Sequence, residues 1–207
     1  MIVLNNPAAR KVAAVVIDPP AKLLVKLHVS PDVVTLVGTV GASASALILI
    51  PRGEFIWAIV LITLFALSDL IDGTMARMTG SSGPWGNFLD ATLDRVTDGA
   101  VFGALVWWGA TQQDYWIVGG GLLALVTGQV TSYAKARAEA VGASANVGIA
   151  ERAERLILAG VGILLTGFGV PYVLPVVLWI VGVTGVITVV QRMVEVRRQL
   201  KKDHGGA

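Results

Sequence analysis

The chain has 207 residues, of which 55% are hydrophobic and only 14% are charged. A soluble domain of this size carries about 25% charged residues, so the composition excludes an ordinary water-soluble globule and predicts a compact membrane protein with several spans. The net charge of +2 is small and cysteine is absent. Disulfides are therefore excluded, and we expect no nucleic-acid partner.

Residues 1–31 form a juxtamembrane segment before the first long apolar run. Their stretch NNPAARKVAAVVIDPPAKLLVKLHV mixes basic residues with short apolar runs and is interrupted at Asp18-Pro19-Pro20. It is too polar to span a bilayer, and nothing in it is typical of a secretory signal peptide. We expect an interfacial amphipathic helix here; the alternative is a frayed cytoplasmic tail.

Six apolar segments follow, each close to the roughly 20 residues that a helix needs to cross the hydrocarbon. The breaks between them carry glycine, proline or polar residues, as in the turn from Gly80 to Pro84, and Pro84 suits the first position of a helix. We therefore predict an all-α polytopic membrane protein, one domain in which residues 32–207 form a six-helix transmembrane bundle. The predicted spans are 33–50, 55–76, 85–109, 116–138, 153–169 and 173–191. The first span has small residues suited to close helix packing: Gly38, Gly41, Ala42 and Ser45.

The basic residues are distributed very unevenly between the two sides of this arrangement. With six spans both termini lie on one side, and that side holds fifteen of the sixteen Lys and Arg residues, whereas the other keeps only Arg52. The positive-inside rule then places both termini in the cytoplasm. Five aromatic residues fall at the predicted outer interface, as an aromatic belt would: Trp57, Trp107, Trp108, Tyr115 and Trp116.

Aspartates form a stripe on each of two neighbouring spans. Asp69 and Asp72 are three residues apart on the second span, and Gly86, Asp90 and Asp94 are spaced by four on the third, so each set lies on one helical face. The turn between the spans is short, which makes them antiparallel neighbours whose stripes can face each other. About 20 Å of apolar helix precedes Asp69 in a slab of about 30 Å, so we expect the acids just below the cytoplasmic surface.

Carboxylates packed together in such a setting repel one another, and burying each charge is unfavourable. Divalent cations relieve this repulsion, and oxygen ligands suit Mg²⁺ or Mn²⁺. Four aspartates can hold two ions by sharing ligands, as in enzymes of phosphoryl transfer. The small residues beside the acids, Gly73, Ala76 and Gly86, would leave room for a nucleotide diphosphate. An ion-coupled transporter, whose membrane acids relay protons, is the alternative from another class.

The full pattern from Asp69 to Asp94 reads D-x2-D-G-x2-A-R-x8-G-x3-D-x3-D. At all eight fixed positions it resembles the signature of the CDP-alcohol phosphotransferase family, integral membrane enzymes of phospholipid synthesis. The resemblance implies that an acceptor hydroxyl attacks the phosphorus that bears the lipid in CDP-diacylglycerol, and that CMP leaves. It implies two Mg²⁺ or Mn²⁺ ions on Asp69, Asp72, Asp90 and Asp94, with Asp94 also as the general base.

The same resemblance assigns the CDP-lipid to the residues between and beside these acids. The CDP moiety would be held by Gly73, Ala76, Arg77 and Gly86. The stretch SPDVVT before the first span also resembles the family, which implies that Pro31 and Asp32 touch the CDP-lipid at its base. Asp98 lies outside the signature, one turn past Asp94, and we expect a structural hydrogen-bonding role for it.

The acceptor is indicated by basic residues near the inner ends of the last three spans. The stretches SYAKARAE, ERAERLIL and VVQR resemble those of bacterial family members that use inositol phosphate. A doubly charged phosphate needs several cationic donors, and by position these would be Ser132, Lys135, Arg137, Arg155 and Arg192, with Arg152 a weaker candidate. Two alternatives stay open: glycerol phosphate as the acceptor, in a phosphatidylglycerol-phosphate synthase, and simple anchoring of the basic residues to anionic headgroups.

The family resemblance also predicts the oligomeric state and the location of the protein. It implies a homodimer in the bacterial plasma membrane, among membrane lipids, with the active site on the cytoplasmic side.

Overall fold

The computed structural model describes residues 7–204, and the side chains within 17–202. All regular secondary structure in this part of the chain is helical, with no strand, so the all-α prediction is confirmed. The chain forms two compact units. The first comprises the chain up to Ser45 together with Val60–Thr97, and the second comprises Ala46–Ile59 together with the residues from Asp98 onward.

The first unit begins with α1 (Pro7–Lys26), which contacts α4 (Ser68–Thr79). The expected interruption at Asp18-Pro19-Pro20 is wrong, because α1 continues through both prolines. Proline has a fixed φ near −65°, which fits helical backbone, so the pair removes hydrogen-bond donors without forcing the helix to end here.

The predicted second span is two helices in the structure. α3 (Phe55–Ala66) and α4 are separated at Leu67, where the Ser68 hydroxyl donates a hydrogen bond of 2.6 Å to the Phe65 carbonyl. Such a local side-chain bond competes with the regular helical ladder and favours a bend. The apolar run itself gives no sign of this break.

α2 (Pro31–Leu49) packs closely against this bend, as its small residues predicted. A Cβ added at Gly38 would overlap the Ser68 side chain, and one added at Gly41 would overlap the Phe65 ring. Small residues at such positions let helix backbones approach each other. The contact brings the start of α2 beside the start of α4, where the first acids lie.

The turn between α4 and α5 (Pro84–Thr111) agrees with the prediction. Gly80 ends α4 with φ +68°, a left-handed conformation typical of a helix C-terminus, and the Ser81 amide donates to the Ala76 carbonyl at 3.0 Å. Pro84 is the first residue of α5, where its missing N–H needs no partner.

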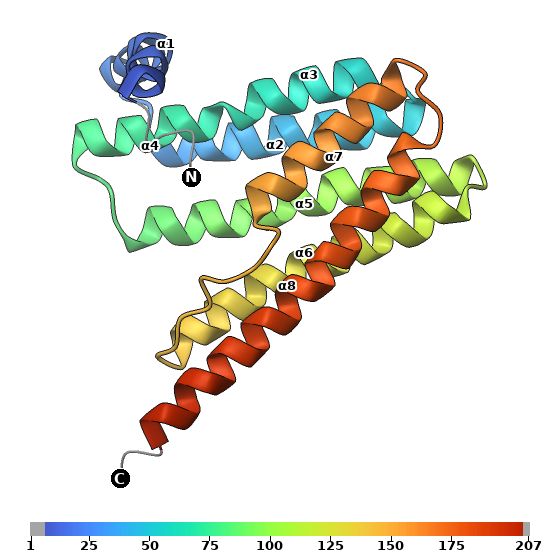
Figure 1. Ribbon diagram of the computed structural model, residues 1–207. Coiled ribbons are helices and arrows are strands. Elements are labelled where there is room, and N and C mark those ends of the chain that lie inside the picture. The colour runs from blue at the N-terminus through green and yellow to red at the C-terminus, as the bar shows by residue number, and fades with distance from the viewer. Residues whose placement is uncertain (1–6, 205–207) are drawn as a thin grey trace. The chain divides into compact units, whose positions relative to one another are not determined.

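The second unit contains the short helix η2 (Ile50–Arg52), α6 (Tyr115–Ala140), α7 (Arg152–Gly167) and α8 (Val173–His204). Asp114 starts α6 by accepting hydrogen bonds from the Trp116 and Ile117 amides at 3.0 and 3.1 Å. α6 and α8 lie side by side along their length (Figure 1). Their contact depends on Gly182, where a Cβ would approach Leu123 at 2.8 Å.

The loop from Val141 to Glu151 is held on α8 by side-chain hydrogen bonds. Gln199 accepts from the Ser144 amide and donates to the Ser144 carbonyl, both at 2.8 Å, and the Thr188 hydroxyl accepts from the Ala150 amide at 3.3 Å. Gly148 has φ +145°, and a Cβ there would overlap Thr188. The loop is therefore fitted closely to α8 immediately before α7 begins.

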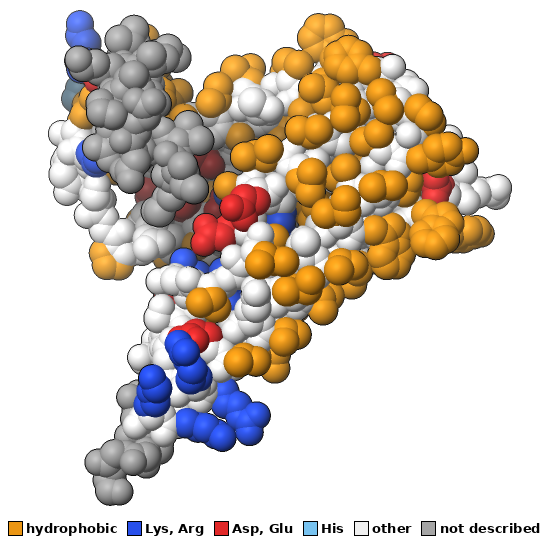
Figure 2. Space-filling view, viewed as in Figure 1, with side chains coloured by type: hydrophobic (Ala, Val, Ile, Leu, Met, Phe, Trp, Pro, Cys, Tyr) orange, Lys and Arg blue, Asp and Glu red, His pale blue; other side chains and the backbone are white. Residues whose placement is uncertain are grey.

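Four helical segments of the described residues are long and apolar enough to cross a membrane: Pro31–Arg52, Phe55–Thr79, Tyr115–Ala140 and Val173–Lys202. The other two predicted spans coincide with α5 and α7. In α5 the charged residues of the first half leave only the second half apolar, and α7 has 16 residues, which cover about 24 Å. Figure 2 shows hydrophobic side chains over α7 and α8, and Lys and Arg gathered towards the C-terminal end of α8.

Candidate functional site

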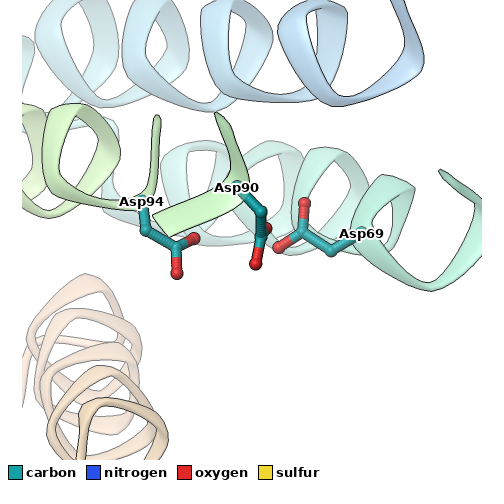
Figure 3. Close-up of side chains that lie close together, drawn as sticks. All are labelled: Asp69, Asp90 and Asp94. Atoms are coloured by element: carbon teal, nitrogen blue, oxygen red, sulfur yellow. The ribbon is translucent and has the colours of Figure 1, made fainter. Parts of the chain in front are cut away.

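Three of the four predicted metal ligands lie together in the first unit. Asp69 comes from the first turn of α4, and Asp90 and Asp94 are one turn apart on α5 (Figure 3). Each offers a carboxylate oxygen, and the three oxygens lie within 4.8 Å of one another. Asp69 and Asp90 are exposed and Asp94 is half-buried, so an ion could reach them from outside.

The donor set fits a divalent cation of the Mg²⁺ or Mn²⁺ type. Such ions bind oxygen ligands. Three converging carboxylates can bind one ion, whose positive charge offsets their mutual repulsion. Arg95 supplies a countercharge beside the cluster, with Nη2 at 3.8 Å from Asp94 Oδ2. The facing of the two acidic stripes, predicted from the spacing and the short turn, is confirmed by this cluster.

Asp72, the fourth predicted ligand, is buried and lies outside the cluster of three. Its Oδ2 accepts a hydrogen bond from the Thr35 hydroxyl on α2. One carboxylate oxygen is thus held by the protein, and Thr35 fixes the orientation of the group. Thr35 was not predicted as a site residue; its place one turn after Asp32 in SPDVVT is the one signal that could have indicated it.

The small residues of the signature differ in the space around them. Nothing lies within 4 Å of a Cβ added at Gly86, so open space adjoins this residue at the start of α5. A Cβ added at Gly73 would lie 3.6 Å from an Arg77 nitrogen. Arg77 is exposed, and its Nη2 donates to the Thr74 hydroxyl at 2.8 Å, so its guanidinium group lies over the α4 face that carries Gly73. Ala76 is half-buried on the same helix.

The other predicted CDP-lipid contacts lie at the start of α2. Pro31 is the first residue of this helix, and the Asp32 carboxylate accepts a hydrogen bond of 2.8 Å from the Trp85 indole. Trp85 immediately precedes Gly86 and is exposed. The indole therefore links the start of α2 to the open space beside Gly86, a contact between distant segments that the sequence pattern does not show.

In the second unit, two of the predicted cationic residues are almost completely buried. Arg155 is 3% exposed and Arg192 is 6% exposed. Arg155 lies beside α6, within 3.8 Å of a Cβ added at Gly128, and Arg192 Nη1 donates to the Thr131 carbonyl at 2.6 Å. Ser132 completes this stretch, with its hydroxyl donating to the Gly128 carbonyl at 3.3 Å. The structure thus brings Ser132, Arg155 and Arg192 to one region of α6.

Lys135 and Arg137, by contrast, are exposed near the end of α6. Lys135 continues the face that carries Gly128 and Ser132, because these positions are spaced by four and three residues. Arg137 lies on a different face. The predicted acceptor set therefore consists of a buried part and an exposed part.

Asp98 contributes an ion pair of the second unit. It is 4% exposed, and its Oδ1 accepts a hydrogen bond of 3.1 Å from Arg152 Nε. Asp98 thus makes the kind of hydrogen bond expected for it, with Arg152 as its partner. Because Arg152 begins α7, this pair fixes the helix that carries Arg155.

Comparison with known proteins agrees with this combination of a helical fold and an acidic cluster. Residues 28–191 match the family model described as CDP-alcohol phosphatidyltransferase. The chain therefore belongs to the CDP-alcohol phosphatidyltransferase family, and it is a membrane-bound transferase of phospholipid biosynthesis.

Within this family, the chain is similar in sequence to two curated phosphatidylinositol phosphate synthases. The chain is 50% identical over 187 residues to the phosphatidylinositol phosphate synthase of Corynebacterium glutamicum, covering 89% of this chain and 85% of the relative. It is 48% identical over 202 residues to the enzyme of the same name from Streptomyces avermitilis, covering 94% and 83%.

Solved structures of the Mycobacterium tuberculosis phosphatidylinositol phosphate synthase have the same fold. The crystal structure with CDP-DAG bound superposes with a TM-score of 0.83 at 43% identity, covering 86% of this chain and 92% of the other. The crystal structure of that synthase in complex with manganese and citrate also has a TM-score of 0.83, covering 86% and 87%.

Proposed function

We propose that this enzyme transfers the phosphatidyl group of CDP-diacylglycerol to a hydroxyl of inositol phosphate, which forms phosphatidylinositol phosphate and releases CMP. The observation that carries the proposal is the converging cluster of Asp69, Asp90 and Asp94 in a chain that is 50% identical to a phosphatidylinositol phosphate synthase. The cluster suits the diphosphate chemistry of the family, and the relatives indicate the acceptor.

The acids have separate roles in this proposal. Asp69, Asp90 and Asp94 hold divalent cation, and Asp72 joins them through the oxygen that Thr35 leaves available, so that two Mg²⁺ or Mn²⁺ ions are bound. When bound, the ions neutralise the diphosphate and polarise its P–O bonds. Asp94 takes the proton of the acceptor hydroxyl as that oxygen forms its bond to the phosphorus bearing the diacylglycerol, and the bond from this phosphorus to CMP breaks.

The CDP-lipid is bound by residues of the first unit. Open space beside Gly86 accommodates the cytidine diphosphate, with Gly73 and Ala76 lining its approach. Arg77 turns from Thr74 towards a phosphate, which gains a charge-assisted hydrogen bond. Pro31 and Asp32 contact the base, and Trp85 keeps the Asp32 carboxylate in place.

The acceptor's phosphate is bound by residues of the second unit. Arg155 and Arg192 supply buried guanidinium groups, whose fork geometry suits phosphate oxygens. Ser132 supplies a hydroxyl, and Lys135 and Arg137 add positive charge nearer the solvent. Ionic attraction is stronger at buried groups than in water, so we assign most of the acceptor affinity to the two buried arginines.

We further propose the membrane arrangement in which this site works. α5 and α7 cross the bilayer together with the four long apolar segments, giving six spans in one domain. α1 lies in the interface as an amphipathic helix, and both termini and the active site face the cytoplasm of a bacterial plasma membrane. The working form is a homodimer.

The test uses the purified full-length protein with CDP-diacylglycerol and Mg²⁺, with CMP release as the readout. We expect release that depends on inositol phosphate and stops when the metal is chelated. Release with glycerol phosphate alone would instead identify a phosphatidylglycerol-phosphate synthase. No release with any alcohol, together with ion flux in proteoliposomes, would indicate a transporter.

A further inference from the structure

A groove lies between the C-terminal ends of α6 and α8, within the second unit. Its volume is about 610 Å³, inside the range of about 300–1,000 Å³ that is typical of small-molecule sites. The floor is apolar and includes Ala138, Val141, Val196 and Leu200. Val196 and Leu200 pack against the buried Ala138, so the floor is a packed surface.

Four cationic side chains line this groove: Arg137 of α6, and Arg192, Arg197 and Lys201 of α8. Arg192 is buried, and the other three are exposed and form the rim. Arg197 and Lys201 are four residues apart on one helix face, where like charges repel each other. None of the described residues that line the groove is acidic. Glu195 of the same helix is engaged elsewhere, with Arg198 at 2.9 Å and Gln199 at 2.7 Å.

The position of the groove along α8 matches the boundary of a bilayer. Arg192 lies about 28 Å along the helix from Val173, close to the thickness of a hydrocarbon core of about 30 Å. The residues from Met193 to Lys201 then occupy about the next 13 Å, where headgroups lie. The apolar floor thus begins at the edge of the hydrocarbon, and the cations follow at the depth of phosphate groups.

We propose that this groove binds an anionic phospholipid of the surrounding bilayer. The glycerol and the first part of an acyl chain lie on the floor, and the headgroup phosphate lies between Arg137, Arg197 and Lys201. Basic pockets between membrane helices bind anionic headgroups in this way. The anion also removes the repulsion between Arg197 and Lys201. A second copy of this chain fits less well, since a two-fold contact would bring two basic rims together.

This lipid is distinct from the substrate of the proposed reaction, and the inference holds whichever acceptor the enzyme uses. Arg137 and Arg192 are also among the proposed acceptor residues, so the test changes only Arg197 and Lys201. The matched control is Arg198→Ala with Lys202→Ala, which removes the same charge one residue further along α8. Neither Arg198 nor Lys202 lines the groove.

The experiment measures lipid retained by the full-length protein after release from vesicles of phosphatidylglycerol and phosphatidylcholine, by native mass spectrometry. We expect the wild-type protein to retain phosphatidylglycerol in preference to phosphatidylcholine. Arg197→Ala with Lys201→Ala should lower this retention roughly tenfold, because the headgroup loses two cations that line the groove. The control should lower it less than about threefold, because its two cations do not line the groove. Val141→Trp, which keeps every charge but obstructs the floor, should lower it as well.

Three results would overturn the proposal. Equal losses in both double variants would show a diffuse surface charge in place of a site. Complete displacement of the lipid by inorganic phosphate would show a plain anion site. A change from dimer to monomer in Arg197→Ala with Lys201→Ala alone would show that the groove is a contact between copies.

Discussion

Arg152 Nε donates a hydrogen bond of 3.1 Å to Asp98 Oδ1 and so joins the start of α7 to the middle of α5. The carboxylate side chain is 5% exposed and the arginine side chain 30% exposed. Removing one partner of such a pair leaves the other charge without compensation in a poorly solvated place, which destabilises the fold.

We therefore expect Asp98→Asn to lower the free energy of unfolding by roughly 1–3 kcal/mol, less than for a fully buried pair because Arg152 is partly solvated. Thermal unfolding of the detergent-solubilised protein measures this change. The control is Glu195→Gln, which breaks an ion pair whose arginine is 65% exposed and should therefore change the stability much less. Equal losses in the two variants would contradict the structural role of Asp98.

Asp94→Asn should separate chemistry from binding. The amide has the shape of the carboxylate but cannot take the acceptor's proton, so we expect kcat to fall by about 10²- to 10⁴-fold. Binding of CDP-diacylglycerol, measured by calorimetry, should stay within about threefold. Glu139→Gln, at an exposed position of α6, should leave both quantities unchanged. If Asp94→Asn unfolds the protein, Asp94 has a structural role and the assignment is wrong.

Gly86→Val tests whether the open space beside Gly86 receives the nucleotide. Nothing lies within 4 Å of an added Cβ there, so the melting temperature should change little. The KM for CDP-diacylglycerol should nevertheless rise by about tenfold or more, because the new side chain takes the space of the substrate. Gly103→Val is a matched control on the same helix, since Gly103 is also free of neighbours within 4 Å. A similar rise in the control would contradict a local effect.

Arg155→Ala should raise the KM for inositol phosphate about tenfold or more, since hydrogen bonds to charged groups contribute about 1.5–3 kcal/mol. The KM for CDP-diacylglycerol should change much less. Steady-state CMP release measures both, and Arg155→Lys should restore part of the loss because it keeps the charge without the fork geometry. Equal changes in the two KM values would count against an acceptor pocket at Arg155.

Most helices could be predicted from the sequence because their causes are local. Runs of apolar residues define α2, α6 and α8, and turn residues such as Gly80 and Pro84 mark helix ends. The division of α3 from α4 could not be predicted, because it depends on the Ser68 hydroxyl bonding to a carbonyl within an unbroken apolar run. The opposite error concerns α1. Its two prolines predicted a break, because proline disfavours a helix interior, but the helix continues through both of them.

The same distinction applies to the site: some of its features depend on local sequence, and others depend on residues far away in the chain. The cluster of Asp69, Asp90 and Asp94 follows from helical spacing and one short turn, so the pattern alone predicted it. The different position of Asp72 follows from Thr35, which is 37 residues earlier in the chain. Likewise, the partner of Asp98 is 54 residues away, and no periodicity connects them.

The hydrogen bond from Thr35 to Asp72 has a consequence for how such enzymes diverge. The family signature starts at Asp69, so it contains the acceptor of this bond but not its donor. A substitution of Thr35 by valine would leave every residue of the signature unchanged. Asp72 would nevertheless lose the hydrogen bond that fixes its orientation. We therefore expect sequences that keep the signature but lose a hydroxyl at position 35 to bind their ions differently.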